Sequence, residues 1–102
     1  MTVIAREVFS AQRPSGERFD LIVEIGAPEP SKEHEHEWRC SLSLSPIHKS
    51  IRSMAGDGAL QALCLSVRLA YQMLEDFVAK GGTLTHDDGS GVDLKAIFGI
   101  PK

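Results

Sequence analysis

Alternating apolar and polar positions mark two strands in the first half of the chain. Every second residue is apolar within Arg18–Gly26 and again within Trp38–Ser45. A period of two is typical of a strand that buries one face. Serine occupies three outward positions of the second strand, so we expect that face of the sheet to meet water rather than another layer. Val3–Ala11 shows a weaker version of the pattern and is a third candidate strand.

Turn-forming residues separate these strands. Residues 12–17 contain the proline and glycine of a hairpin loop, and a second hairpin is expected through residues 27–30. The two prolines of that second link, Pro28 and Pro30, should prevent it from continuing the ladder. After a turn at Ser45-Pro46, residues 49–55 fit either a fourth strand or a helical turn. We favour the strand, because three strands offer only a small apolar face.

The longest periodic segment predicts one helix over residues 58–80. Asp57 is placed to cap its first N–H groups, and Gly81-Gly82 can adopt the positive φ that ends a helix. At 100° per residue one stripe of this helix is apolar throughout and should cover the sheet. The stripe consists of Leu60, Leu63, Cys64, Val67, Ala70, Tyr71, Leu74, Phe77 and Val78. Trp38 is expected to be largely buried against the stripe, near Leu63, Val67 or Tyr71.

The end of the chain carries three shorter signals. Thr83–Thr85 is a short strand candidate, residues 86–91 form a polar loop, and Asp93 is placed to cap a final helical turn that runs to Phe98. The chain is therefore predicted to be a single α+β domain over residues 1–102. Its antiparallel meander would have three to four strands, with one long helix packed across one face and a short C-terminal strand and helical turn.

The composition is that of an ordinary folded domain. Of 102 residues, 42% are hydrophobic and 25% are charged, and the net charge is −3. No basic excess is present to neutralise phosphates, which argues against nucleic-acid binding, and no apolar run approaches the roughly 20 residues that a membrane span needs. The two cysteines, Cys40 and Cys64, fall on inward positions and are expected to be small buried side chains. So few cysteines, with no signal pattern at the start, favour a cytoplasmic protein.

The segment from residue 33 to residue 37, Glu-His-Glu-His-Glu, is the first candidate for chemistry. If the next strand begins early, His34 and His36 point to one side, about 6.5–7 Å apart. Two imidazoles so placed could chelate Zn²⁺ or Ni²⁺, with a glutamate or Cys40 as a third ligand. The alternative is a solvated acidic loop, which we favour because two ligands on an exposed loop lack the surroundings that fix imidazoles. We therefore assign no metal and no cofactor.

A second polar cluster comprises His86, Asp87 and Asp88. The histidine beside two carboxylates could supply a general base. The cluster could equally be a turn, since Asp88-Gly89 is a strong turn signal, and its spacing does not match a calcium loop. The sequence also contains no phosphate-binding glycine loop and no Gly-x-Ser-x-Gly elbow. No catalytic residue is assigned.

The far side of the predicted helix is also apolar. Leu65, Leu69 and Met73 fall at about 140°, 180° and 220° from Leu60 and form a ridge spaced four residues apart, called here the Leu65–Met73 ridge. We expect that a single helix on a single sheet cannot bury both this ridge and the core stripe. Either residues 49–55 or 93–98 of the same chain cover it, or it meets its twin across a two-fold axis. We predict a homodimer with these three residues near the interface.

Three short motifs resemble those of a known family. Residues 38–40 are Trp-Arg-Cys, residues 56–65 are Gly-Asp-Gly-Ala-Leu-Gln-Ala-Leu-Cys-Leu, and residues 98–101 are Phe-Gly-Ile-Pro. They resemble a family of small bacterial domains of unknown function with a Trp-x-Cys strand, a Gly-x-Asp-x-Leu-Gln-Ala-Leu helix start and a Leu-Gly-x-Pro ending. Here the acid, Asp57, stands one place earlier than in that pattern. The resemblance implies a bacterial, stand-alone single domain with its strands before the helix, and it implies no activity.

These observations define three classes of function. The leading hypothesis is a non-enzymatic cytoplasmic interaction module that acts as a homodimer. By analogy, it could be an inhibitor or immunity protein whose acidic face covers a basic toxin site. The alternative is a metal- or small-ligand-binding protein that uses His34 and His36. The third is an enzyme that uses His86 with Asp87 or Asp88.

Overall fold

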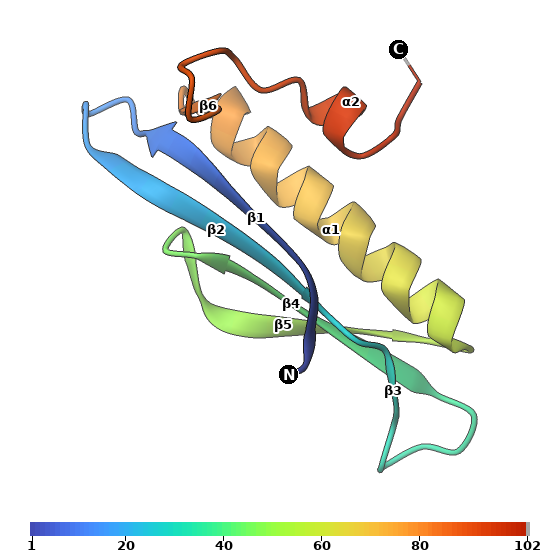
Figure 1. The fold of residues 1–102 in the computed structure, drawn as a ribbon. Coiled ribbons are helices and arrows are strands. Elements are labelled where there is room, and N and C mark those ends of the chain that lie inside the picture. The colour runs from blue at the N-terminus through green and yellow to red at the C-terminus, as the bar shows by residue number, and fades with distance from the viewer. Residues whose placement is uncertain (102) are drawn as a thin grey trace.

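The computed structural model describes residues 1–101, except for the side chain of Lys49, and it confirms the α+β class. Figure 1 shows one antiparallel sheet with a long helix, α1 (Ala59–Ala79), and a short helix, α2 (Leu94–Ile97), on the same face. The strands are β1 (Val3–Gln12), β2 (Arg18–Gly26), β3 (Glu29–Pro30), β4 (Trp38–Ser45), β5 (His48–Gly56) and β6 (Thr83–Thr85). Within the described residues, no helix combines the length and the apolar character needed to cross a membrane.

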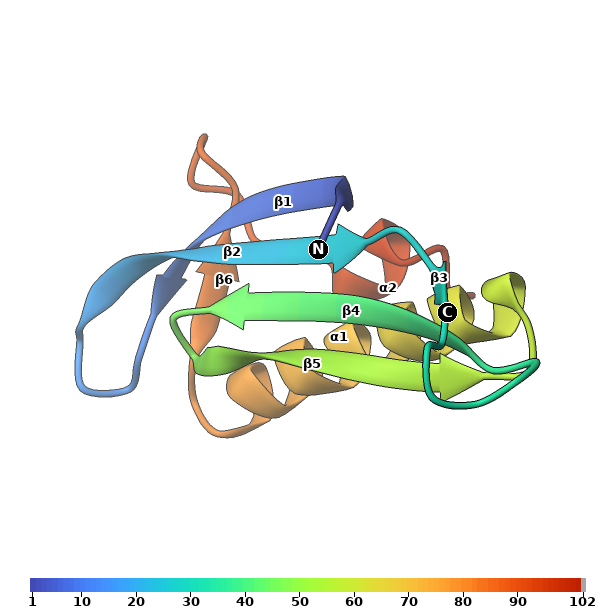
Figure 2. The ribbon, with the colours of Figure 1, turned by 90° about the horizontal axis from the view of Figure 1, so that it is seen from below.

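The strands follow the predicted meander. β1, β2, β4 and β5 lie side by side in that order, each antiparallel to the next, and β6 pairs with the outer edge of β1. Residues 49–55 therefore belong to a strand, as the sequence favoured. The face of the sheet away from the helices carries no further layer (Figure 2), which agrees with the serines expected there.

The link between β2 and β4 corrects one expectation. Its prolines were expected to keep it out of the ladder, yet β3 pairs with the start of β4, Glu29 opposite Arg39 and Pro30 opposite Trp38. A proline is tolerated here because β3 is only two residues long and lies at the end of the sheet.

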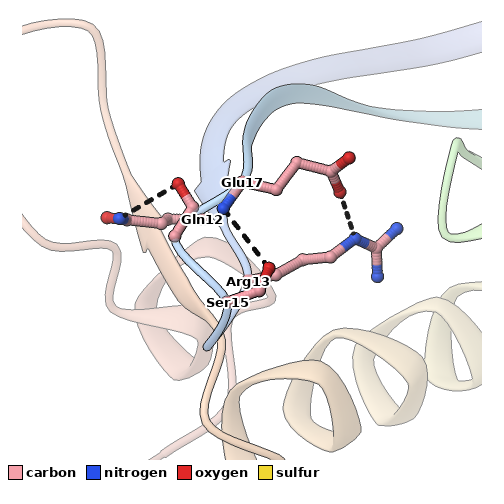
Figure 3. Close-up of polar contacts among 5 residues, drawn as sticks. Gln12, Arg13, Ser15 and Glu17 are labelled. Carbon is pink, nitrogen blue, oxygen red and sulfur yellow. Dashed lines mark hydrogen bonds and ion pairs between the residues drawn. The ribbon is translucent and has the colours of Figure 1, made fainter.

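A tight hairpin joins β1 to β2, as its proline and glycine predict. The N–H of Arg13 donates to the carbonyl of Glu17 at 2.8 Å, and the N–H of Gly16 donates to the carbonyl of Arg13 at 2.9 Å. Gly16 has a φ of +96°, which only glycine adopts without strain. Figure 3 shows the side chains that brace this loop. Arg13 Nε lies 2.6 Å from Glu17 Oε1, while Gln12 and Ser15 bond to the loop backbone.

The ends of α1 match the prediction to within one residue, but the predicted cap is wrong. Gly58 is the N-cap, and no side chain bonds to the first turn of the helix. The N–H of Asp57 instead donates to Gln61 Oε1 at 2.6 Å. A side chain of the helix therefore bonds to the backbone of the residue before the N-cap. At the other end, the N–H groups of Gly81 and Gly82 both bond back to carbonyls of the last turn at 3.0 Å. Gly81 has a φ of +99°, as the stop signal predicts.

The face that α1 turns to the sheet differs from the predicted stripe. Its fully buried residues are Ala62, Ser66, Ala70 and Leu74. Leu60 is 73% exposed, Val78 is 44% exposed, and Cys64 is exposed rather than buried. The apolar arc of the helix is wider than one face, and its smallest side chains allow the closest approach to the sheet. The helix is therefore rotated toward the small residues, away from Leu60.

The core otherwise lies where the strands predict. Phe9, Leu21, Leu42 and Leu44 are buried between the sheet and the helices, and Cys40 is fully buried as expected. Trp38 has most of its surface buried, as expected, and packs against this core.

Candidate functional site

The His34–His36 loop does not form the chelating pair that an early strand would create. β4 begins two residues after His36, which has a φ of 66°, and both imidazoles are exposed. The loop is closed locally: Ser31 Oγ accepts from the N–H of His34 at 3.3 Å, and the N–H of Ser31 donates to the carbonyl of Glu37 at 2.8 Å. Among the described residues, no group of three His, Cys, Asp or Glu side chains is placed to hold a metal ion.

Residues 86–90 form a tight turn. The N–H of His86 donates to the carbonyl of Ser90 at 2.8 Å, and the N–H of Gly89 donates to the carbonyl of His86 at 2.9 Å. The His86 ring lies edge-on to Phe9, with 6.3 Å between ring centroids. The third function hypothesis placed a general base at His86. In the structure His86 follows the end of β6, and its ring packs against the ring of Phe9.

Asp88 anchors the same turn. Its Oδ1 accepts hydrogen bonds from Ser90 Oγ at 2.6 Å and from the N–H of Ser90 at 2.9 Å. These bonds favour the charged form and hold the pKa of Asp88 below its ordinary value of 3.8. A carboxylate with a lowered pKa is a weak general base at neutral pH. The arrangement therefore stabilises a turn and offers little for proton transfer.

The Leu65–Met73 ridge lies along β5. Leu65 shares a hollow with Ala55 and Gly56 at the end of that strand, and Met73 shares another with His48 at its start. Leu69 and Met73 pack against the core, and all three ridge residues are half-buried. Residues 49–55 thus help to cover the ridge, as one of the two predicted outcomes states, and each ridge residue keeps only a minor part of its surface exposed.

The outer edge of β5 is open. Within the described residues, β5 pairs only with β4, so one row of its backbone N–H and C=O groups faces away from the sheet. An unpaired strand edge is a template for another strand. The opposite edge of the sheet differs, because β1 is covered there in part by β6. The open edge and the ridge together form the candidate interaction surface, called here the β5 surface.

A groove of about 630 Å³ lies on the other flank of α1. Its walls are mainly the apolar side chains Leu63, Val67, Tyr71, Phe98 and Ile100. Tyr71 packs edge-on against Phe98 at 5.3 Å, and burial followed by a hydrogen bond with Glu75 raises the pKa of its hydroxyl. Arg68 and Glu75 also line the groove. One cation and one anion do not select a class of ligand, so we assign none.

The sequence did not reveal that β5 would be the edge strand. The predicted meander would place its fourth strand at an edge, but the pattern of residues 49–55 left open whether that segment is a strand at all. One signal was present: β5 contains His48, Lys49 and Arg52 and no acid. Charged residues, lysine in particular, are common on exposed edges.

In comparisons with known proteins, no family model, no curated protein and no solved structure matches the chain. The family resemblance drawn from the three sequence motifs therefore stays a prediction. Any assignment of function depends on the geometry described above.

Proposed function

We propose that the chain is a non-enzymatic protein-interaction module that acts as a homodimer through the β5 surface. One observation carries the proposal: an unpaired strand edge runs beside an apolar ridge that is only partly buried. Backbone groups on the edge supply hydrogen bonds to a partner, and the ridge supplies apolar area. A two-fold axis beside β5 would let each copy offer the same surface to the other.

The two candidate sites with chemistry support this choice. The His34–His36 loop is exposed and held by hydrogen bonds to Ser31, and Asp88 accepts hydrogen bonds from Ser90. A cytoplasmic location belongs to the same proposal. Both cysteines are free thiols and Cys64 is exposed, which suits a reducing compartment. The net charge of −3 likewise favours a protein partner over nucleic acid.

The test is the mass of the particle in solution, measured by light scattering after size exclusion at tens of micromolar chain. We expect twice the chain mass of 11.1 kDa. Leu65→Lys is expected to shift the protein to the monomer, because it puts a charge on the ridge. Leu65 suits this test better than Leu69, which packs against the core and whose loss would also lower stability.

Leu60→Lys is the matched control. Leu60 is also on α1 and is 73% exposed, but it lies on the opposite flank of the helix. This variant should remain a dimer. A wild type that is monomeric at these concentrations contradicts the proposal, as does a folded Leu65→Lys variant that remains dimeric.

A further inference from the structure

We infer that two copies of the chain join their sheets through residues 52–56 of β5, with Met54 on the two-fold axis. The inference deepens the proposed homodimer, on which it rests, by naming the partner strand and its register. It is argued from the regularity of β5, from the charges at the ends of this segment and from the position of the ridge.

Only part of β5 has the regular backbone that a strand of a second copy could pair with. From Arg52 opposite Leu42 to Gly56 opposite Trp38, the pairing with β4 is continuous. The register then shifts between Leu42 and Leu44, so residues 49–51 form an irregular stretch. Such irregularities bend a strand and interrupt pairing at an edge. The regular row of free backbone groups is therefore the five-residue segment 52–56.

Symmetry fixes the register of that segment on itself. In an antiparallel pair around a two-fold axis, the middle residue faces its own copy, and here the middle residue is Met54. Arg52 then faces Gly56 of the second copy, next to Asp57 of that copy. Arg52 and Asp57 are both exposed, and within the described chain neither forms an ion pair. The segment thus carries a cation at one end and an anion just past the other, which makes it complementary to itself when reversed.

The same axis brings the two ridges together. α1 runs along β5 in the opposite direction, with Leu65 near the end of the strand and Met73 near its start. In Figure 2 part of α1 extends past the edge that β5 forms. A two-fold axis at Met54 would therefore bring Leu65, beside the end of the strand, close to Leu65 of the second copy, with Leu69 and Met73 farther from the axis. Strand pairing and ridge burial then occur in one interface.

Disulfide crosslinking tests the register. In a Cys40→Ala, Cys64→Ser background, which removes the exposed thiol and the thiol that faces Met54 within the same chain, Met54→Cys should form a crosslinked dimer on mild oxidation. Facing residues in an antiparallel pair have Cα atoms about 4.5–5.5 Å apart, within the range of a disulfide. Ser50→Cys in the same background is the control. The two copies of residue 50 would lie about 25 Å apart along the strand, and no crosslink is expected.

A charge swap gives an independent measurement. Arg52→Glu and Asp57→Lys should each weaken dimerisation about tenfold, since each places two like charges near one another across the strand pair. The double variant should restore the wild-type dissociation constant. If the wild type is a dimer but Met54→Cys does not crosslink and the double variant does not recover, this register is wrong while the homodimer stands. If the wild type is a monomer, both proposals fail.

Discussion

At the scale of single residues, Cys40 links three elements of the fold. Ser66 Oγ on α1 donates to the carbonyl of Cys40 at 2.6 Å, and Cys40 Sγ donates to the carbonyl of Gly26 at 3.2 Å. Gly26 is the last residue of β2, where the ladder to β4 breaks before β3. Ser66 is the one buried polar residue among the described positions, and its hydrogen bond accounts for its place in the core.

Removing this hydroxyl should be costly. Ser66→Ala is expected to lower the free energy of unfolding by about 1–2 kcal/mol, because a buried hydrogen bond between α1 and β4 is lost. Urea denaturation followed by circular dichroism measures the change. Ser10→Ala, at an exposed position of β1 outside the proposed interface, is the control and should change stability little. Equal losses in both variants would show that the buried bond contributes nothing.

The turn at Asp88 should make the stability of the protein depend on pH. The carboxylate form is favoured in the folded state, so its contribution to stability is present above its ordinary pKa of 3.8 and is lost as pH falls through the lowered value. Ser90→Ala removes the side-chain bond, which is the largest cause of the shift. The pKa of Asp88 should therefore rise in that variant, as an NMR titration of the carboxyl carbon would report. An unchanged pKa would mean that the serine hydroxyl does not hold the carboxylate.

At the scale of elements, Gly56 sets how α1 leaves the sheet. A Cβ built on Gly56 would lie 2.6 Å from the backbone nitrogen of Ala62, so the first turn of the helix packs directly on the end of β5. No flexible side chain is available there to move aside. The close approach therefore requires glycine at position 56.

Gly56→Ala is expected to lower the free energy of unfolding by about 1–3 kcal/mol, because the backbone of β5 or α1 must shift. Gly91→Ala is the matched control, since a Cβ there has no neighbour within 4 Å and its φ is not positive. Thermal unfolding of both variants gives the comparison. A neutral Gly56→Ala variant would contradict the close approach.

At the scale of the whole molecule, the sheet is covered on one face, and its edge at β5 is open along the whole strand among the described residues, whereas β6 covers the end of β1 at the other edge. β4 has neighbours on both sides, whereas β5 has one. Backbone amides of β4 should therefore exchange hydrogen more slowly than those of β5 in dilute protein. This difference follows from strand order alone and applies to the isolated chain.

Concentration should change that pattern. When the dimer forms, alternate amides of residues 52–56 gain partners and should exchange at least tenfold more slowly, whereas amides in the middle of α1 should keep their rates. Hydrogen exchange read by NMR at two protein concentrations measures both. Exchange in β5 that is independent of concentration, in a sample known to contain dimer, would place the interface elsewhere.

The sequence by itself determined the elements of this protein. Period-two alternation located β2 and β4 to the residue, and the turn residues located the first hairpin. The glycine pair ended α1, and Asp93 was correctly predicted as the cap of α2, where its side chain accepts from the N–H of Ala96. These features depend on contacts within a few residues, which a linear pattern records directly.

Only the tertiary structure decided which way α1 faces and which strand is left open. The helix is apolar over an arc wider than the sheet can cover, so hydrophobicity alone allowed several rotations. Close packing selected the one that puts Ala62, Ser66 and Ala70 against the strands and leaves Leu60 and Cys64 outside. The open edge of β5 likewise follows from the order of the strands. Both features arise from contacts between segments far apart in the chain, and no local pattern carries them.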